Sequence, residues 1–299
     1  MRPKTLFKSL LFTFSFIGSC LVLDKPIKAG ESPICPDPST TSITSIYDES
    51  DSNSFFAVTD GQGYCRSTPD KYGVTVFKMG FCKKNPGNPT GSDIKYSELP
   101  DYSSCTWAFE STTGEAADFS AGGSIDLSEA ASSIPTAGTY PHGVMIISNT
   151  FRIKGKYGPV AGETFYSTDT FEQSATDISS WDTTPAPLTS FSGPNECTAA
   201  TEGEVVVGGT ISGYLLDSNG IMQTNTPENT GAPCTGTEKL LGVMNMSSDL
   251  TISDTTNGLK MTFIVSSNGM SVSTNSSKVF PPTELIMSSG PFSVTFETF

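Results

Sequence analysis

The chain has 299 residues and carries 17 Lys and Arg residues against 31 Asp and Glu residues, a net charge of −14 at neutral pH. Phosphate backbones attract the opposite sign, so this composition argues against nucleic-acid binding. About 270 residues follow a short leader, enough for one large domain or two medium ones.

The first 29 residues have the layout of a secretory signal peptide. A basic stretch over residues 2–8 precedes an apolar run over residues 10–23, and Ala29 provides a small residue for cleavage. The run is shorter than the roughly 20 residues that a membrane-spanning helix needs, so we expect export and cleavage. Cleavage after Ala29 leaves 12 basic and 30 acidic residues, a net charge near −18.

Lipidation is the alternative for this leader. Residues 17–20, Ile-Gly-Ser-Cys, resemble a bacterial lipobox, in which Cys20 would carry a lipid. The apolar run continues through residues 21–23, which a lipobox cysteine rarely tolerates. No other segment is apolar and long enough to span a membrane, so we expect a mature chain without a transmembrane segment.

Six cysteines follow the leader, and an even number in an exported chain indicates disulfides. The sequence alone does not choose the pairing, but short loops close most easily, which favours neighbours along the chain. A zinc site is not indicated, because no CxxC pair occurs and the chain has one histidine. The expected disulfides are Cys35–Cys65, Cys82–Cys105 and Cys197–Cys234.

The N-terminal half alternates short apolar segments with clusters of Gly, Asn, Asp, Ser, Thr and Pro, the pattern of strands and turns. Residues 83–101 form a polar loop between Cys82 and Cys105, and residues 128–134 could form a helical turn. The segments 143–147 and 151–155 look like paired strands joined at Ser148-Asn149-Thr150. The expected strands cover residues 54–58, 72–79, 107–109, 143–147 and 151–155.

Asn-Gly dipeptides organise the C-terminal third. Asn219-Gly220 predicts a hairpin between residues 213–216 and 221–222, because Asn-Gly accepts the positive φ angles of a tight turn. Asn257-Gly258 and Asn268-Gly269 separate three further apolar segments, which predicts an antiparallel meander over residues 250–273. A last strand is expected at residues 292–296.

The Pro-rich segment 183–195 is the best candidate for a domain boundary. We therefore expect an all-β, antiparallel β-sandwich of the jelly-roll or immunoglobulin-like type, stapled by disulfides, in two domains. The first covers residues 30–190 with an extended N-terminal arm, and the second covers residues 191–299 with the meander. The alternative is one large sandwich in which this segment is a surface loop.

No catalytic, cofactor or metal site is expected. His142 is the only histidine, lies before a strand and is expected to be a packed or surface residue. Trp107 and Trp181 could stack on sugars, but tryptophan in a strand is more often core. The acidic run at residues 48–53 could ligate Ca²⁺, but it lacks the glycine and glutamate positions of an EF-hand loop.

These observations predict an exported structural or adhesive cell-surface protein, with the repeating subunit of an extracellular filament or layer as one form. One alternative is a secreted module that binds glycans or a partner protein. The other is a secreted glycoside hydrolase, whose two carboxylates the sequence does not identify. The expected partners are copies of the chain, other surface proteins or glycans.

Overall fold

The computed structural model describes residues 33–298, except residues 39, 49, 60, 62, 121–134, 193–195, 207, 226–230, 257–258 and 275–279. The expected signal peptide, Cys20 and the expected helical turn at residues 128–134 lie outside the described residues. Ser32–Phe299 forms one compact unit, and its described part is nearly all β.

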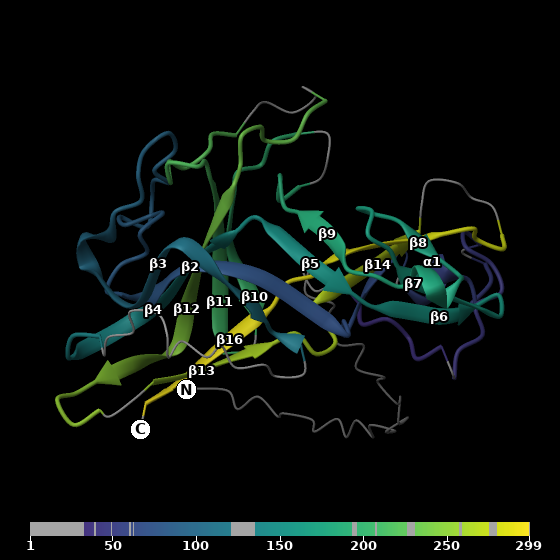
Figure 1. Ribbon diagram of the computed structural model, residues 1–299, viewed down its shortest axis with the longest axis horizontal. Coiled ribbons are helices and arrows are strands. Elements are labelled where there is room, and N and C mark those ends of the chain that lie inside the picture. Colours follow the sequence, from purple (N-terminus) through teal and green to yellow (C-terminus); the bar gives the residue numbers. More distant parts are fainter. Residues whose placement is uncertain are drawn as a thin grey trace, which may run out of the picture. The chain divides into compact units, whose positions relative to one another are not determined.

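The described elements are one short helix, two 3-10 turns and a series of strands, and Figure 1 labels the helix and most of the strands. They are α1 Phe55–Val58, β1 Tyr64–Ser67, β2 Lys71–Cys82, η1 Tyr102–Ser104, β3 Cys105–Asp118, β4 Gly138–Ser148, β5 Thr150–Lys154, β6 Lys156–Val160, β7 Glu163–Ser167, β8 Ser174–Ala175, η3 Ile178–Ser180, β9 Thr184–Pro187, β10 Ala200–Val206, β11 Gly209–Leu216, β12 Lys239–Ile252, β13 Leu259–Ile264, β14 Met270–Thr274, β15 Leu285–Ser289 and β16 Ser293–Thr298.

An eight-stranded antiparallel sheet dominates the structure, in the order β10-β11-β12-β4-β2-β5-β9, with β3 also paired to β2 (Figure 1). Strands from both sides of residue 190 meet in it, since β12 pairs with β4 and places Val243 opposite Val144. The boundary expected near residue 190 falls between β9 and β10, and both of these strands lie on the same side of β2, with β3 on its other side.

The strands β4 and β5 are successive parts of one bent strand, and both pair antiparallel with β2. Ile147 in β4 lies opposite Val76, and Arg152 in β5 lies opposite Gly73. The expected pairing of these two segments with each other is therefore wrong. Asn149 bends the strand instead of reversing it, and the outer neighbour changes there from β12 to β9.

A second bent pair replaces the predicted meander. β13 pairs with β16, β14 pairs with β15, and the two pairs follow one another as one long hairpin. Ile264 lies opposite Ser293 and Met270 opposite Ser289, so five residues on one side of the bend face three on the other. The predicted meander is wrong, because the chain bends at residues 265–269 and does not fold back on itself.

Close backbone contact at Gly290 makes this bend feasible. A Cβ at that position would lie 1.9 Å from the carbonyl oxygen of Asn268, so a larger residue does not fit. The amide of Gly290 also donates to the carbonyl of Gly269 at 2.8 Å. The long hairpin therefore changes direction where a glycine on one strand meets the bulged loop of the other.

Two shorter expectations have different outcomes. The turn at Asn219-Gly220 is confirmed: Gly220 has φ +84°, the Asp217 amide donates to the Ile221 carbonyl at 2.9 Å, and Leu216 bridges to Met222. Residues 55–58, expected as strand, form the helix α1 instead. The Ser54 hydroxyl accepts a hydrogen bond from the Ala57 amide and caps that helix.

The main core lies between the inner face of the large sheet and the long hairpin. Phe263 of the hairpin stacks on Phe119 with ring centroids 3.6 Å apart, and Tyr72 and Phe292 join the same aromatic group. Apolar side chains meet across two facing layers, so the expected antiparallel, sandwich-like all-β fold is confirmed. The other contributors include Val76, Met79, Ile147, Leu215, Leu240, Val272, Met287 and Val294.

Candidate binding groove

The outer face of the large sheet carries a second apolar cluster, which includes Val144, Ile146, Tyr214 and Leu241. The loop 83–104 packs over it, with Ile94 and Tyr102 against the cluster. Both ends of this loop are joined by the disulfide Cys82–Cys105, whose cysteines also lie opposite each other in β2 and β3. The loop 83–104, which we call the stapled loop, is thus held closed at its base.

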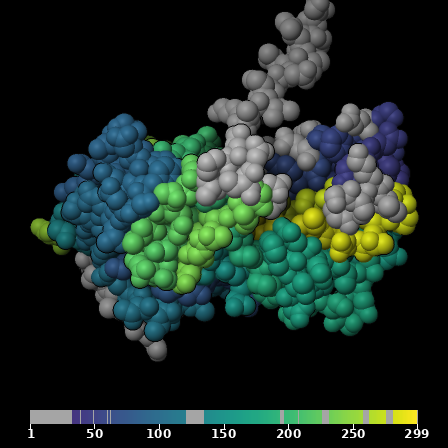
Figure 2. All heavy atoms as spheres, turned by 90° about the horizontal axis from the view of Figure 1, so that it is seen from above, coloured from purple at the N-terminus to yellow at the C-terminus, as the bar shows by residue number. Residues whose placement is uncertain are grey.

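Polar contacts fix the body of the loop on β10 and β11. The Asn85 side-chain amide donates to the Tyr214 hydroxyl at 2.7 Å, and that hydroxyl donates to the Glu202 carboxylate. Asn88, which is buried, donates to both oxygens of Glu202 at 3.2 Å. Figure 2 shows the blue surface of the segment with the loop and β3 beside the green surface of the segment with β11 and β12.

A β-bulge in β2 places two consecutive side chains on the outer face. Val76 pairs with Ile147 and Lys78 pairs with Ile146, so Phe77 is the extra residue. Val76 and Met79 point into the main core on either side of it. Phe77 and Lys78 therefore both face outward, which simple alternation along a strand does not predict.

These elements enclose a groove of about 510 Å³ on the outer face. Its apolar lining comes from the strands, from the stapled loop and from the turn after β11, and its polar lining includes hydroxyl, amide, ammonium and carboxylate groups. The lining residues are Phe77, Lys78, Leu99, Tyr102, Glu110, Ser111, Thr112, Ile146, Leu216, Asn219, Gly220 and Lys239. None of them was a candidate from the sequence, because the bulge and the loop position depend on distant pairing.

The two lysines of the groove have different partners. Lys78 Nζ lies 2.6 Å from Glu110 Oε1 and 5.2 Å from the ring centre of Trp107. Lys239 Nζ donates to the Ser218 carbonyl at 2.9 Å and lies 5.2 Å from the ring centre of Phe77. The groove therefore offers one neutralised ion pair and one cation without a carboxylate partner among the described residues.

Tyr102 remains a neutral hydrogen-bonding group in this setting. Burial raises the pKa of its phenol well above the ordinary value, so the hydroxyl keeps its proton at physiological pH. Its ring also packs edge-on against Trp107 with centroids 5.4 Å apart. An aromatic surface with adjacent polar groups is thus the main chemical character of the groove.

His142 lies outside the groove lining. It is opposite Cys82 on β2 and Asn245 on β12. Its Nδ1 is buried without a hydrogen-bond partner among the described residues, and burial lowers its pKa, with Asp249 acting in the opposite direction. His142 is half-buried, an environment between the packed and the surface positions expected for it.

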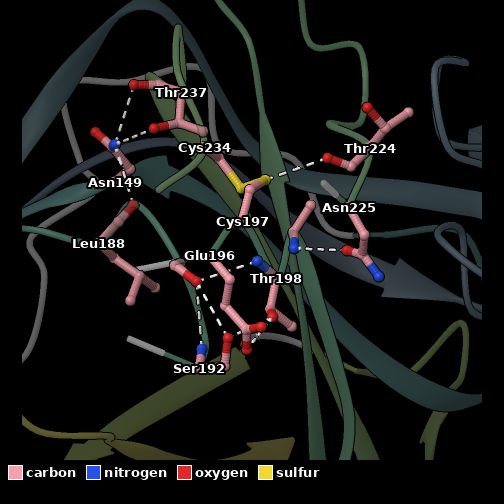
Figure 3. Close-up of a disulfide and its surroundings, with 12 residues drawn as sticks. Asn149, Leu188, Ser192, Glu196, Cys197, Thr198, Thr224, Asn225, Cys234 and Thr237 are labelled. Atoms are coloured by element: carbon pink, nitrogen blue, oxygen red, sulfur yellow. Dashed lines mark hydrogen bonds between the residues drawn. A yellow bond between two sulfur atoms is a disulfide. The ribbon is translucent and has the colours of Figure 1, made fainter. Parts of the chain in front are cut away.

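The six cysteines form the pairs Cys35–Cys65, Cys82–Cys105 and Cys197–Cys234, the sequential order expected from the sequence. The third disulfide sits beside the bend of the β4–β5 strand (Figure 3). Its Cys197 sulfur lies 3.2 Å from the Thr224 carbonyl oxygen, and the Cys234 amide donates to the Thr189 carbonyl at 3.0 Å. This disulfide therefore ties together the segments before β10 and before β12.

Asn149 joins the two neighbours of the bent strand. Its side-chain amide donates to the Leu188 carbonyl at 3.2 Å and to the carbonyl and hydroxyl oxygens of Thr237 at 3.0 and 3.1 Å (Figure 3). Its backbone amide donates to the Glu238 carbonyl, and its carbonyl accepts from the Leu188 amide. The buried Asn149 side chain thus donates hydrogen bonds to carbonyl oxygens of both neighbouring segments, at the point where the bent strand changes its outer neighbour.

The acidic run at residues 48–53, of which residue 49 lies outside the described residues, makes local hydrogen bonds. The carboxylate of Asp48 accepts from the amide and hydroxyl of Ser50, and that of Asp51 accepts from the Asn53 amide and the Thr44 hydroxyl. Among the described residues no group of three or more His, Cys, Asp or Glu side chains could hold a metal ion. In the same part of the chain, no helix is long and apolar enough to cross a membrane.

Comparison with protein-family models, with curated proteins and with solved structures found no match for this chain.

Proposed function

We propose that this protein is an exported adhesive protein of the cell surface and that it binds a glycan in the outer-face groove. The observation that carries the proposal is the mixed lining of the groove, in which the rings of Phe77 and Tyr102 adjoin hydroxyl and amide groups. A sugar has apolar C–H faces and polar edges, so a site for it combines aromatic surface with a few hydrogen-bonding groups.

The scaffold supports a role outside the cytoplasm. Disulfides persist in oxidising compartments, and the three in this chain close loops with sequence separations of 23, 30 and 37 residues. Each such closure stabilises the folded state by about 3–4 kcal/mol through the unfolded chain. A groove whose loop is cross-linked at its base is preorganised, which lowers the entropy cost of binding.

Two edge strands of the large sheet, β9 and β10, favour an adhesive protein over a subunit that assembles by strand addition at these edges. β10 carries the exposed residues Glu202 and Glu204 and has a register shift between positions 201 and 204. β9 contains Pro185 and Pro187, which lack an amide proton. Charges, bulges and prolines are the devices that discourage pairing at sheet edges.

Among the described residues that line the groove, the carboxylate pair that glycoside hydrolysis requires is absent. Among its lining residues Glu110 is the one acidic side chain, and it is paired with Lys78. Hydrolysis by either common route needs two carboxyl groups on opposite sides of the sugar bond. The proposal is therefore binding without cleavage.

A glycan array probed with the purified, disulfide-intact protein tests the proposal. We expect a restricted set of neutral glycans to bind, and Leu99→Ala to weaken that binding at least tenfold, because Leu99 lines the groove and is 61% exposed. The matched control is Ile34→Ala, at an apolar residue 65% exposed outside the groove lining. Absence of any glycan binding, or equal losses in the two variants, would contradict the proposal.

A further inference from the structure

A row of basic residues crosses the outer face at the other end of β2. Arg152 and Lys154 alternate along β5 with Phe151 and Ile153, which point into the main core. Lys71 of β2 lies directly opposite Lys154. Lys156 begins β6 and faces away from the core, since its neighbour Tyr157 is a core residue.

We name Lys71, Arg152, Lys154 and Lys156 the basic row. They are four of the 12 basic residues that follow the expected leader, and three of them lie in residues 130–162, a segment without Asp or Glu. Three of them are exposed and Lys154 is half-buried. Alternate side chains on a strand lie roughly 7 Å apart and opposed Cβ atoms about 5 Å apart, so the row presents a compact band of positive charge.

Aromatic rings hold part of this row in place. Lys154 Nζ lies 4.8 Å and Lys156 Nζ 5.3 Å from the ring centre of Trp181. Tyr166, which is opposite Lys156 in β7, packs on the same indole with centroids 5.7 Å apart. Cation–π contacts restrict the two ammonium groups, so less entropy is lost when they bind an anion.

Among the described residues, no carboxylate forms a salt bridge with the basic row. The salt bridges among the described residues are Lys78–Glu110 and Lys95–Glu98, and neither includes a member of the row. Asp118, which is opposite Gly73, accepts hydrogen bonds from the amides of Tyr72 and Ser120, and its charge interacts with that of Lys71. The amide of Asp70 donates to the Lys154 carbonyl at 2.7 Å. Like charges held opposite each other destabilise a sheet, so an external anion would relieve this repulsion.

From this arrangement we propose that the basic row is a second binding site and that its ligand is an anionic polysaccharide. A linear chain with carboxylate or sulfate groups matches a band of cations along a strand. The planar guanidinium of Arg152 suits two-point contact with such groups. The site is separate from the groove, because six residues of β2 lie between Lys71 and Lys78, and the seven residue steps span roughly 23 Å along an extended strand.

The aromatic geometry favours a polysaccharide over a nucleic acid. Single-stranded nucleic acids bind by stacking bases on open aromatic faces. Two lysines already lie over the indole of Trp181, so the row offers cations where such a protein would offer a free ring. Sugars with charged groups need the cations and only the edge of an aromatic ring.

Binding can be measured by titrating the disulfide-intact protein with polygalacturonate and with dextran sulfate, using neutral dextran as the uncharged probe. We expect either polyanion or both to bind with an affinity that falls steeply with salt and to raise the Tm, while neutral dextran does neither. The double variant Lys154→Gln/Lys156→Gln should weaken binding at least tenfold, and Arg152→Gln, at an exposed position, should weaken it several-fold.

The matched control is the double variant Lys83→Gln/Lys84→Gln, which removes two exposed charges from the stapled loop. It should keep most of the affinity. Equal losses of polyanion affinity in the two double variants would mean that net charge alone explains the binding, which would overturn the site. Binding of only single-stranded DNA or only phosphatidylserine vesicles would overturn the ligand class. Groove variants such as Leu99→Ala should leave polyanion binding unchanged, so the two proposals can fail separately.

Discussion

At the two ends of the outer face of β2, lysine side chains have opposite kinds of partner. At the groove, Lys78 is 2.6 Å from the Glu110 carboxylate, and the ion pair leaves a nearly neutral, aromatic surface. At the basic row, Lys71 faces Lys154, and Lys154 and Lys156 lie over the indole of Trp181. None of these lysines forms a salt bridge among the described residues. The same strand thus supports a site suited to neutral sugars and a site suited to anions.

The difference lies in what covers the sheet. Over the groove, a loop tied by Cys82–Cys105 packs on an apolar cluster and brings Leu99 and Tyr102 to its wall. Over the basic row, the sheet is covered by the short segment that ends at Trp181. The amide of the next residue, Asp182, donates to the Ser167 carbonyl. The groove therefore depends on a cross-link, whereas the row depends on strand register.

The largest expected effect comes from removing that cross-link. Cys82→Ala with Cys105→Ala should lower the free energy of unfolding by about 3 kcal/mol, because the disulfide closes a loop of 23 residues. Glycan binding in the groove should be lost and polyanion binding by the row retained. Denaturant unfolding and the two binding assays measure these outcomes.

The control for this experiment is Cys35→Ala with Cys65→Ala, which opens a loop of 30 residues away from the groove. It should cost a similar free energy and leave both kinds of binding in place. If the two double variants lose groove binding equally, general destabilisation and not loop position explains the loss.

The next largest effect is expected at the bend between the two sites. Asn149→Ala should lower the free energy of unfolding by about 2 kcal/mol, because it leaves the Leu188 and Thr237 carbonyls without their side-chain donor. Asn245→Ala, at an exposed position of β12, should change it by less than about 0.5 kcal/mol. Equal chemical-denaturation midpoints for the two variants would show that the amide does not hold the bend.

Asn149 also shows where sequence reasoning stops. Asn219-Gly220 was correctly assigned as a reversal because the turn and its two strands lie within a few residues. Asn268-Gly269 is the same dipeptide, and Ser148-Asn149-Thr150 also favours a turn, yet at both places a long strand bends. Whether the chain reverses or bends depends on which distant strand pairs with it, and local residue types do not contain that information.

The same limit applies to the sites. The alternation of strands, the all-β class and the sequential disulfides could be expected from spacing and composition. The groove could not, because it needs the bulge at Phe77 and a loop placed on β11 by Asn85. The basic row had a readable signal, since Arg152, Lys154 and Lys156 alternate along the chain, but Lys71 and Trp181 join it only through tertiary structure.

A smaller effect is expected when the groove is made more like the row. Glu110→Gln removes the partner of Lys78, and because both side chains are 39–48% exposed the free energy of unfolding should change by less than about 1 kcal/mol. On the array, the bound glycans should shift toward acidic sugars. Glu98→Gln, which removes the 3.9 Å partner of Lys95 on the stapled loop, is the matched control and should not shift them.

The smallest expected effect concerns the charge of His142 at the edge of the cross-linked region. Burial lowers its pKa below the ordinary value of 6.5, and Asp249 offsets part of this, so the folded protein takes up its proton at lower pH than the unfolded chain does. The free energy of unfolding should therefore fall as the pH drops through about 6.5 toward the folded-state pKa. His142 is the only histidine, so proton NMR of an untagged sample resolves its titration without assignment. Comparison with His142→Gln isolates its share of the pH dependence, and a folded-state pKa above 6.5 would mean that Asp249, and not burial, governs this residue.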